Sequence, residues 1–153
     1  MTYKPEWGPG TDIGCRVYHS AAQSISNASL TALAFDSERY DTDGMHDTSS
    51  NNSRITFARA GKYLVGFTVT FPLDVDGIRV LKIRKNGSTV IAEDAKTASN
   101  KRDHSQTLNT LALFAAGDYI EFLVYQTSGG NLDVNSAARY TPEAWAQKVD
   151  RAG

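Results

Sequence analysis

Cysteine is almost absent from this sequence. Cys15 is the only one in 153 residues, which excludes an internal disulfide and any metal centre built from several thiolates. A lone cysteine on an alternating segment is predicted to be a small buried apolar residue. The cysteine content therefore leaves the redox compartment undecided.

Long apolar runs and an excess of charge of one sign are also missing. No stretch approaches the roughly 18 apolar residues of a membrane span, and the first residues, MTYKPEWGPGTD, have no basic segment followed by an apolar core. The 16 Lys and Arg nearly balance the 17 Asp and Glu, for a formal net charge of -1. We therefore expect no membrane insertion, no nucleic-acid partner, and synthesis in the host cytoplasm without a signal peptide.

Catalytic motifs are missing as well. His19, His46 and His104 are far apart, and no G-x-S-x-G or H-E-x-x-H segment accompanies any of them. Glu93 and Asp94 are neighbours on a predicted strand, so they point to opposite faces and cannot act as an acid/base pair. The sequence therefore predicts no enzyme, no catalytic residue and no cofactor.

The strongest pattern lies in the segment 60–72, AGKYLVGFTVTFP. Its large apolar side chains fall on every second position: Tyr63, Val65, Phe67, Val69 and Phe71. This period of two is that of a β-strand with one buried face, and the Val, Thr, Phe and Tyr content suits a strand better than a helix. We predict that this segment is the central strand of the domain.

Other short alternating segments are separated by turn residues. Asn86-Gly87 between two of them is a strong hairpin signal, because both residues tolerate positive φ. The remaining predicted strands cover 15–19, 30–35, 54–58, 78–85, 89–94, 106–115, 118–125 and 132–134. Residues 140–149 fit either a helix or a strand, and the alternation of Trp145, Gln147 and Val149 favours the strand. The fold class is therefore all-β, of sandwich or jelly-roll type.

Two of the predicted strands are apolar on both faces. In 108–114, Leu111 and Leu113 face away from Phe114, and in 119–125, Leu123 and Tyr125 alternate with other apolar residues. A two-layer sandwich buries only one face of each sheet, so a second apolar face needs another cover. This pattern favours oligomerisation.

The order of motifs along the chain resembles the globular head of complement C1q and its tumour-necrosis-factor-like relatives. The matching segments are Leu33–Phe35, Arg39–Asp41, Arg54–Phe57, Ala60–Leu64, the Asn86-Gly87 hairpin and Ala116–Ile120, with Phe57, Gly61, Tyr63, Gly117 and Asp118 at the signature positions. The resemblance covers 14–149 and implies a jelly-roll β-sandwich that forms homotrimers. We accordingly divide the chain into an extended N-terminal arm (1–13), the C1q-like domain (14–149) and a C-terminal tail (150–153).

Two segments resemble the form of this head found on bacteriophage structural proteins: Tyr40–Asp47 and Thr89–Asp94. That resemblance implies a trimeric knob for binding or capping on the virion surface. No Gly-X-Y stalk precedes Gly14, which favours a protein seated directly on the particle. The expected partners are further copies of the chain, phage capsid or tail proteins, and a host-surface glycan.

Three groups of candidate site residues follow. For the trimer interface we name Leu108, Phe114, Tyr119, Leu123, Tyr125 and Trp145, and for anchoring the arm Tyr3 and Trp7. For a cationic surface that binds an anionic glycan or the virion we name Arg79, Lys82, Arg84, Lys101 and Arg102, although such charges also protect an edge strand from aggregation. Asp41, Asp43 and Asp47 have the acid spacing of a calcium loop but no EF-hand frame, so a turn capped by aspartates is favoured over a calcium site.

The sequence therefore predicts a non-enzymatic virion module, a trimeric capsid decoration or head-spike protein. The alternative is a tail-fibre head that recognises a glycan or protein on the host surface. A small carbohydrate-active enzyme on a jelly roll is disfavoured, because no acid/base pair is available.

Overall fold

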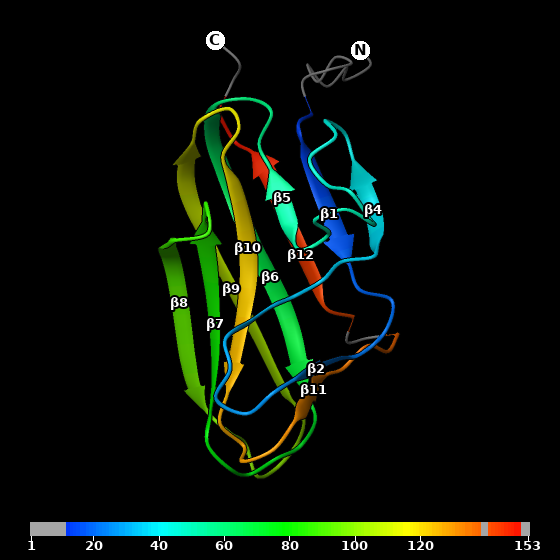
Figure 1. Ribbon diagram of the computed structural model, residues 1–153, viewed down its shortest axis with the longest axis vertical. Helices are drawn as coiled ribbons and strands as arrows, with labels where there is room; N and C mark the ends of the chain where they lie inside the picture. Colours follow the sequence, from blue (N-terminus) through cyan, green and yellow to red (C-terminus); the bar gives the residue numbers. More distant parts are fainter. Residues whose placement is uncertain (1–11, 139–140, 151–153) are drawn as a thin grey trace, which may run out of the picture.

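Two antiparallel sheets face each other in the computed structural model, which describes residues 12–138 and 141–150 (Figure 1). The strands are β1 Gly14–Tyr18, β2 Gln23–Ile25, β3 Thr31–Ala32, β4 Ser37–Asp41, β5 Arg54–Thr56, β6 Gly61–Phe71, β7 Ile78–Lys85, β8 Thr89–Thr97, β9 His104–Phe114, β10 Tyr119–Gln126, β11 Leu132–Val134 and β12 Glu143–Lys148. One sheet has the order β4-β1-β12-β6-β9, and the other has the order β3-β10-β7-β8, with β5 also paired to β10. Within the described residues no helix is long and apolar enough to cross a membrane. The predicted all-β class is confirmed.

β6 is the strand predicted from residues 60–72. Its five alternating residues, Tyr63 to Phe71, are at most 1% exposed, as expected for a buried face. The prediction that it is the central strand is wrong, because β12 occupies the middle of the five-stranded sheet and β6 lies between β12 and β9. The last strand of the chain inserts between β1 and β6, a neighbour relation that local periodicity does not encode.

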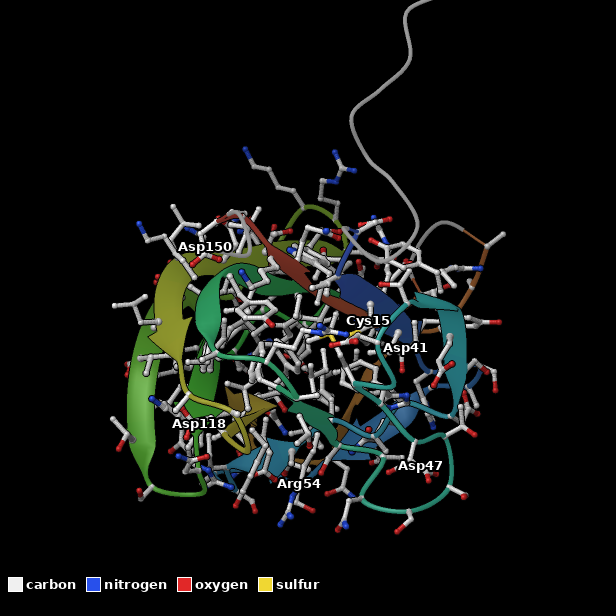
Figure 2. All side chains as sticks on the ribbon, turned by 90° about the horizontal axis from the view of Figure 1, so that it is seen from above. Cys15, Asp41, Asp47, Arg54, Asp118 and Asp150 are labelled. Carbon is white, nitrogen blue, oxygen red and sulfur yellow. The ribbon has the colours of Figure 1, made fainter. Side chains whose placement is uncertain are left out.

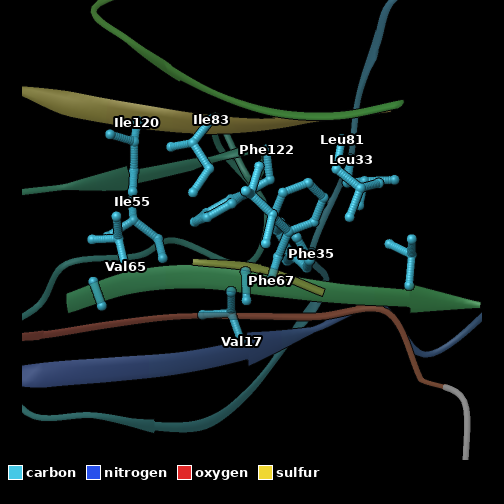
Figure 3. Close-up of a cluster of buried hydrophobic side chains, with 14 of the residues drawn as sticks. Val17, Leu33, Phe35, Ile55, Val65, Phe67, Leu81, Ile83, Ile120 and Phe122 are labelled. Atoms are coloured by element: carbon cyan, nitrogen blue, oxygen red, sulfur yellow. The ribbon is translucent and has the colours of Figure 1, made fainter. Parts of the chain in front are cut away.

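The core lies between the two sheets (Figure 3). Phe122 of β10 meets Phe67 of β6 with ring centroids 5.2 Å apart, so the two layers interdigitate near the middle of the sandwich. Cys15 is fully buried on β1, as predicted. Burial raises the pKa of its thiol, and the nearby Asp41 carboxylate raises it further. This thiol is therefore a packing group rather than a nucleophile.

The Asn86-Gly87 hairpin forms as predicted. Asn86 and Gly87 have φ values of 52° and 74°, and they join β7 to β8 in one antiparallel ladder. The turn at Gly117 has another role: β9 and β10 belong to different sheets, so this turn carries the chain from one layer to the other. The predicted strand 30–35 is reduced to β3, but Leu33 and Phe35 still point into the core.

The ends of the domain are tied to β12. Residues 143–148 form the strand that was favoured over a helix. Ile13, which the sequence assigned to the arm, is 5% exposed, and its carbonyl accepts a hydrogen bond from the Lys148 amide. The folded domain therefore begins before Gly14. The anchor candidates Tyr3 and Trp7 and the tail residues 151–153 lie outside the described residues.

Candidate functional site

The outer face of the five-stranded sheet carries exposed apolar side chains near its β9 edge. Leu111 and Leu113 of β9 are 59% and 69% exposed. In the β6–β9 ladder Leu111 is opposite the half-buried Leu64, and Leu113 is opposite Lys62. We call Leu64, Leu111, Leu113 and Trp145 the outer apolar face. Neighbouring apolar side chains in this position are typical of a surface that another chain covers.

Trp145 extends this face from β12 across β6. A side-chain carbon added at Gly66 would lie 2.8 Å from Cζ2 of Trp145, so the indole occupies the space above this glycine. Arg16 on β1 lies opposite Trp145, with its guanidinium carbon 5.5 Å from the ring centroid. Its Nε donates to Oε1 of Glu143 at 2.7 Å. A glycine at position 66 therefore leaves room for β9, whose Asn109 would lie 2.6 Å from the added carbon, as well as for the indole. Arg16 borders the apolar face on the side of β1.

Three of the six predicted interface residues are enclosed within one protomer. Leu108, Phe114 and Leu123 are 9%, 4% and 1% exposed, so their assignment to an interface is wrong. Leu108 and Phe114 occupy the inward positions of β9, where Phe114 stacks on Phe57 at 3.9 Å between ring centroids. Apolar character alone does not say which face of a strand is inward. The signal that could have corrected the choice is that Leu111 and Leu113 alternate with Phe114.

The other three candidates are half-buried and lie apart from one another. Trp145 belongs to the outer apolar face, whereas Tyr119 and Tyr125 are on β10 in the other sheet. The Arg54 guanidinium carbon lies 4.2 Å from the centroid of the Tyr119 ring. Tyr125 lines a shallow surface hollow with Leu30 and Val80. The structure therefore does not bring the six residues together on one surface.

The five residues of the predicted cationic surface differ in their environment: one is buried, two form ion pairs and two are exposed in a loop. Arg79 is 1% exposed, so its assignment to a binding surface is wrong: it shares the inward face of β7 with the core residue Leu81. Lys82 and Arg84 are paired with Glu93 and Glu121, at 3.3 and 3.1 Å. Lys101 and Arg102 are exposed in the loop that follows β8. The five residues do not form one continuous patch.

The aspartates of the loop after β4 are occupied by local hydrogen bonds. Asp41 accepts from the amides of Met45 and His46 at 2.9 and 3.0 Å, and Arg59 binds Asp43 at 3.2 Å. Asp47 caps a turn, and hydrogen bonds from the amides that follow it hold the pKa of its carboxyl below the ordinary value. Among residues 12–138 and 141–150 no group of three or more His, Cys, Asp or Glu converges as metal ligands would. Asp41 and Asp47 therefore cap turns within this loop through hydrogen bonds from the backbone amides that follow them.

Comparison with known proteins identifies the fold. A TNF protein, Eiger, from S. frugiperda superposes with a TM-score of 0.65 at 13% identity, covering 94% of this chain and 96% of that one. Murine APRIL gives 0.67 at 11% identity, covering 90% and 99%. The globular domain of zebrafish complement 1qA gives 0.63 at 10% identity, covering 92% and 99%. The chain therefore has the jelly-roll fold of TNF-like and C1q-like domains, as predicted.

Sequence comparisons add nothing to this structural likeness. No protein-family model matches the chain, and no curated protein matches it in sequence. At 10–13% identity the structural likeness establishes the fold alone.

Proposed function

We propose that this chain is a non-enzymatic binding or structural module that assembles as a homotrimer on a phage virion, as a capsid decoration or head-spike protein. The observation that carries the proposal is the exposure of Leu111 and Leu113, 59% and 69%, beside Leu64 on a sheet face. Removing these side chains from water stabilises an assembly by about 25 cal/mol per Å² of apolar area.

The position of the outer apolar face suits a closed ring. β9 is an edge strand, so the face continues to the rim of the sandwich. When the rim of one copy packs on the face of the next, the two contacting surfaces differ. Such contacts form a closed ring when the rotation between neighbouring copies is a whole fraction of a full turn. A threefold ring is the arrangement that the sequence resemblance to C1q-like and TNF-like heads implies.

The virion setting is supported by sequence rather than by geometry. Tyr40–Asp47 and Thr89–Asp94 resemble phage-borne heads of this fold. The first segment leads into an exposed loop, and the second belongs to β8, the edge strand of its sheet. Both segments therefore present exposed residues for contact with a particle or a ligand, whereas Met45 of the first is buried.

Two measurements test the proposal at separate levels. Native mass spectrometry of the purified full chain should give three times the 16.7 kDa chain mass, and a stable monomer would contradict the trimer. The same protein should bind isolated phage heads at a fixed ratio, and deletion of 1–10 should abolish attachment if the arm is the anchor. Heads that bind no protein at saturation would contradict the decoration role.

The alternative role is a tail-fibre head that binds a host-surface glycan. It is favoured by a polar pocket beside Arg54, with a volume of about 340 Å³, in the loop between β4 and β5. Free protein should then compete with phage for adsorption to host cells. Undiminished adsorption at saturating protein would rule this role out.

A further inference from the structure

A polar pocket opens in the loop that joins β4 to β5. Its volume is about 340 Å³, and the side chains that matter for binding are those of Asp47, Ser50, Asn51 and Arg54. Figure 2 shows Asp47 and Arg54 on the same side of the molecule. This volume is at the lower end of the range of small-molecule sites and fits one small polar ligand.

Arg54 is unusual among the arginines of the described chain. Arg16, Arg39, Arg59, Arg79 and Arg84 each have a carboxylate within 4.0 Å, whereas Arg54 and Arg102 have none in the described residues. Arg102 is exposed to water, but Arg54 is half-buried, with its Nε enclosed and without a partner in the described part of the chain. A half-buried guanidinium without a counter-ion is costly, and an anionic ligand would offset that cost.

The strand pairing shows why Arg54 stays unpaired. Glu121 of β10 lies directly opposite Arg54, yet its carboxylate binds Arg84 at 3.1 Å. The guanidinium of Arg54 instead lies over the Tyr119 ring, with 4.2 Å between its carbon and the ring centroid. The aromatic ring covers one face of the guanidinium and fixes its plane. The terminal N–H groups form no hydrogen bond with the described residues, so they remain available to a planar, two-pronged acceptor such as a carboxylate.

The pocket is held in shape without a ligand. The buried imidazole of His46 is held between Oε1 of Glu38 at 3.0 Å and the Asn52 carbonyl at 3.1 Å. Asn51 has a φ of 50°, and its carbonyl accepts a hydrogen bond from the Arg54 amide. These contacts fix the loop before binding, which lowers the entropic cost of holding a ligand.

Other lining residues offer groups that can bind hydroxyls. Oδ1 of Asp47 accepts hydrogen bonds from Ser49 and Ser50, whereas its Oδ2 has no partner in the described chain. The side-chain hydrogen bonds of this loop also leave the Ser50 hydroxyl and the Asn51 side-chain amide without a partner among the described residues. The lining of the pocket thus combines one cation with several hydrogen-bond acceptors and donors. The Asp47 carboxylate would repel a compact dianion such as sulfate more strongly than a ligand with a single negative charge, and it would accept hydrogen bonds from a polyol.

We propose that this pocket binds an acidic sugar, a hexuronate-type unit whose carboxylate pairs with Arg54 and whose hydroxyls contact Asp47, Ser50 and Asn51. The binding step is non-covalent and needs no metal. The assignment stands on the pocket alone, independently of the trimer and of the virion role. It also gives the alternative glycan-binding role a defined ligand chemistry.

Titration of the ¹⁵N-labelled full chain with sodium glucuronate tests the site. The amide signals of Ser50, Asn51 and Arg54 should shift, and glucose and sodium acetate should each bind at least tenfold more weakly, because each supplies only half of the contacts. Sodium sulfate or acetate that binds as well as glucuronate would overturn the sugar assignment. Shifts confined to other residues would overturn the site.

Matched arginine variants separate the pocket from general charge. Arg54→Gln should weaken glucuronate binding at least tenfold, about one charge-assisted hydrogen bond. Arg102→Gln removes the same charge from the other arginine that has no carboxylate within 4.0 Å among residues 12–138 and 141–150, and it should leave binding unchanged. Arg54→Lys retains the charge without the planar fork, so it should also weaken binding, and it provides a folded variant if Arg54→Gln proves unstable. Wild-type affinity in both Arg54 variants would contradict the proposal.

Discussion

At the scale of single residues, Asp118 closes the end of the sandwich at the β7–β8 hairpin. Its carboxylate accepts hydrogen bonds from the Asn86 side chain and the Ala115 amide, both at 2.8 Å, and Lys85 lies 3.0 Å away. These contacts, led by the one from Asn86, lower the pKa of Asp118 to about 2. One acidic side chain therefore connects the hairpin with the β9–β10 turn.

The low pKa of Asp118 predicts a defined loss of stability in acid. A carboxyl whose pKa is depressed on folding stabilises the protein above its unfolded pKa, about 4, and this contribution is lost as the pH falls toward the folded value. After allowance for partial exposure, Asp118→Asn should lower the free energy of unfolding by about 1–2 kcal/mol at neutral pH. Urea unfolding should show the wild type and the variant converging between about pH 4 and pH 2. A constant difference across this range would contradict the assignment.

Arg79 is a second residue whose role is structural. Its Nη1 donates to the carbonyls of Asp76 and Ile78 at 2.9 and 3.1 Å, and its Nη2 lies 3.3 Å from Oδ1 of Asp74. The arginine therefore organises the turn that leads into β7.

Replacing Arg79 tests this organising role. Arg79→Met keeps much of the apolar volume but removes every one of these donors, and we expect a loss of about 2–4 kcal/mol in the free energy of unfolding. Arg102→Met at an exposed loop position should change stability by less than about 0.5 kcal/mol. Chemical denaturation of the two variants gives the comparison, and equal stabilities would show that Arg79 is dispensable.

Arg79 and Leu111 show that the alternation of residues along a strand predicts which face each side chain points to. Arg79 is two positions from Leu81 and therefore points to the same face of β7, which is the core face. Leu111 is three positions from Phe114 and therefore points to the opposite face of β9. Alternation along the strand therefore predicts which side chains point inward, whereas charge alone misplaces Arg79 at the surface and apolar character alone misplaces Phe114 at an interface. Arg54 carried no sequence signal, because its lack of a carboxylate partner depends on the neighbours of Glu121 across three strands.

At the scale of elements, the Asn86-Gly87 turn fixes the register of β7 and β8. Gly87 has a φ of 74°, and a side-chain carbon there would lie 3.0 Å from the Tyr119 hydroxyl. Gly130 has open space around it and no positive φ. The two glycines therefore form a matched pair for substitution.

Substituting alanine at these two glycines should affect stability differently. Gly87→Ala should lower the free energy of unfolding by about 1–2 kcal/mol, because an L-residue is strained in this left-handed conformation. Gly130→Ala should be neutral or slightly stabilising, because it only restricts the unfolded chain. Thermal unfolding of both variants tests the pair, and an equal effect would contradict the turn geometry.

Local sequence patterns predict where the strands lie along the chain better than they predict which strands are neighbours in a sheet. The strands β6, β7 and β10 and the hairpin follow from alternation and turn chemistry within single segments. The place of β12 between β1 and β6 and the separation of β9 from β10 do not, because they depend on contacts between segments distant in sequence. The motif order that resembles C1q supplied the jelly roll, and the structural likeness confirms it.

At the scale of the whole molecule, the outer apolar face connects the fold with assembly. The sequence indicated that the second face of β9 needs a cover, and the structure leaves Leu111 and Leu113 exposed there. No other copy is required to complete the core, since Phe114 and Leu108 are enclosed by their own chain. The protomer should therefore fold before it assembles.

A double variant on β9 tests whether the outer apolar face is needed for assembly but not for folding. Leu111→Lys combined with Leu113→Lys places two charges where an interface would exclude water, at a cost of several kcal/mol for each unpaired buried charge. In an isolated protomer both positions are exposed, so the same substitutions should change stability little. Sedimentation should show trimer for the wild type and monomer for the double variant, with unchanged far-ultraviolet circular dichroism.

Leu73 and Val75 supply the control for this variant. They are 52% and 59% exposed in the loop between β6 and β7, away from the outer apolar face. Leu73→Lys combined with Val75→Lys makes a similar change in charge and hydrophobicity. Because these positions lie outside the outer apolar face, this variant should leave the trimer intact. If the loop variant dissociated and the β9 variant did not, the interface would lie at that end of the sandwich, and Leu111 and Leu113 would need another cover.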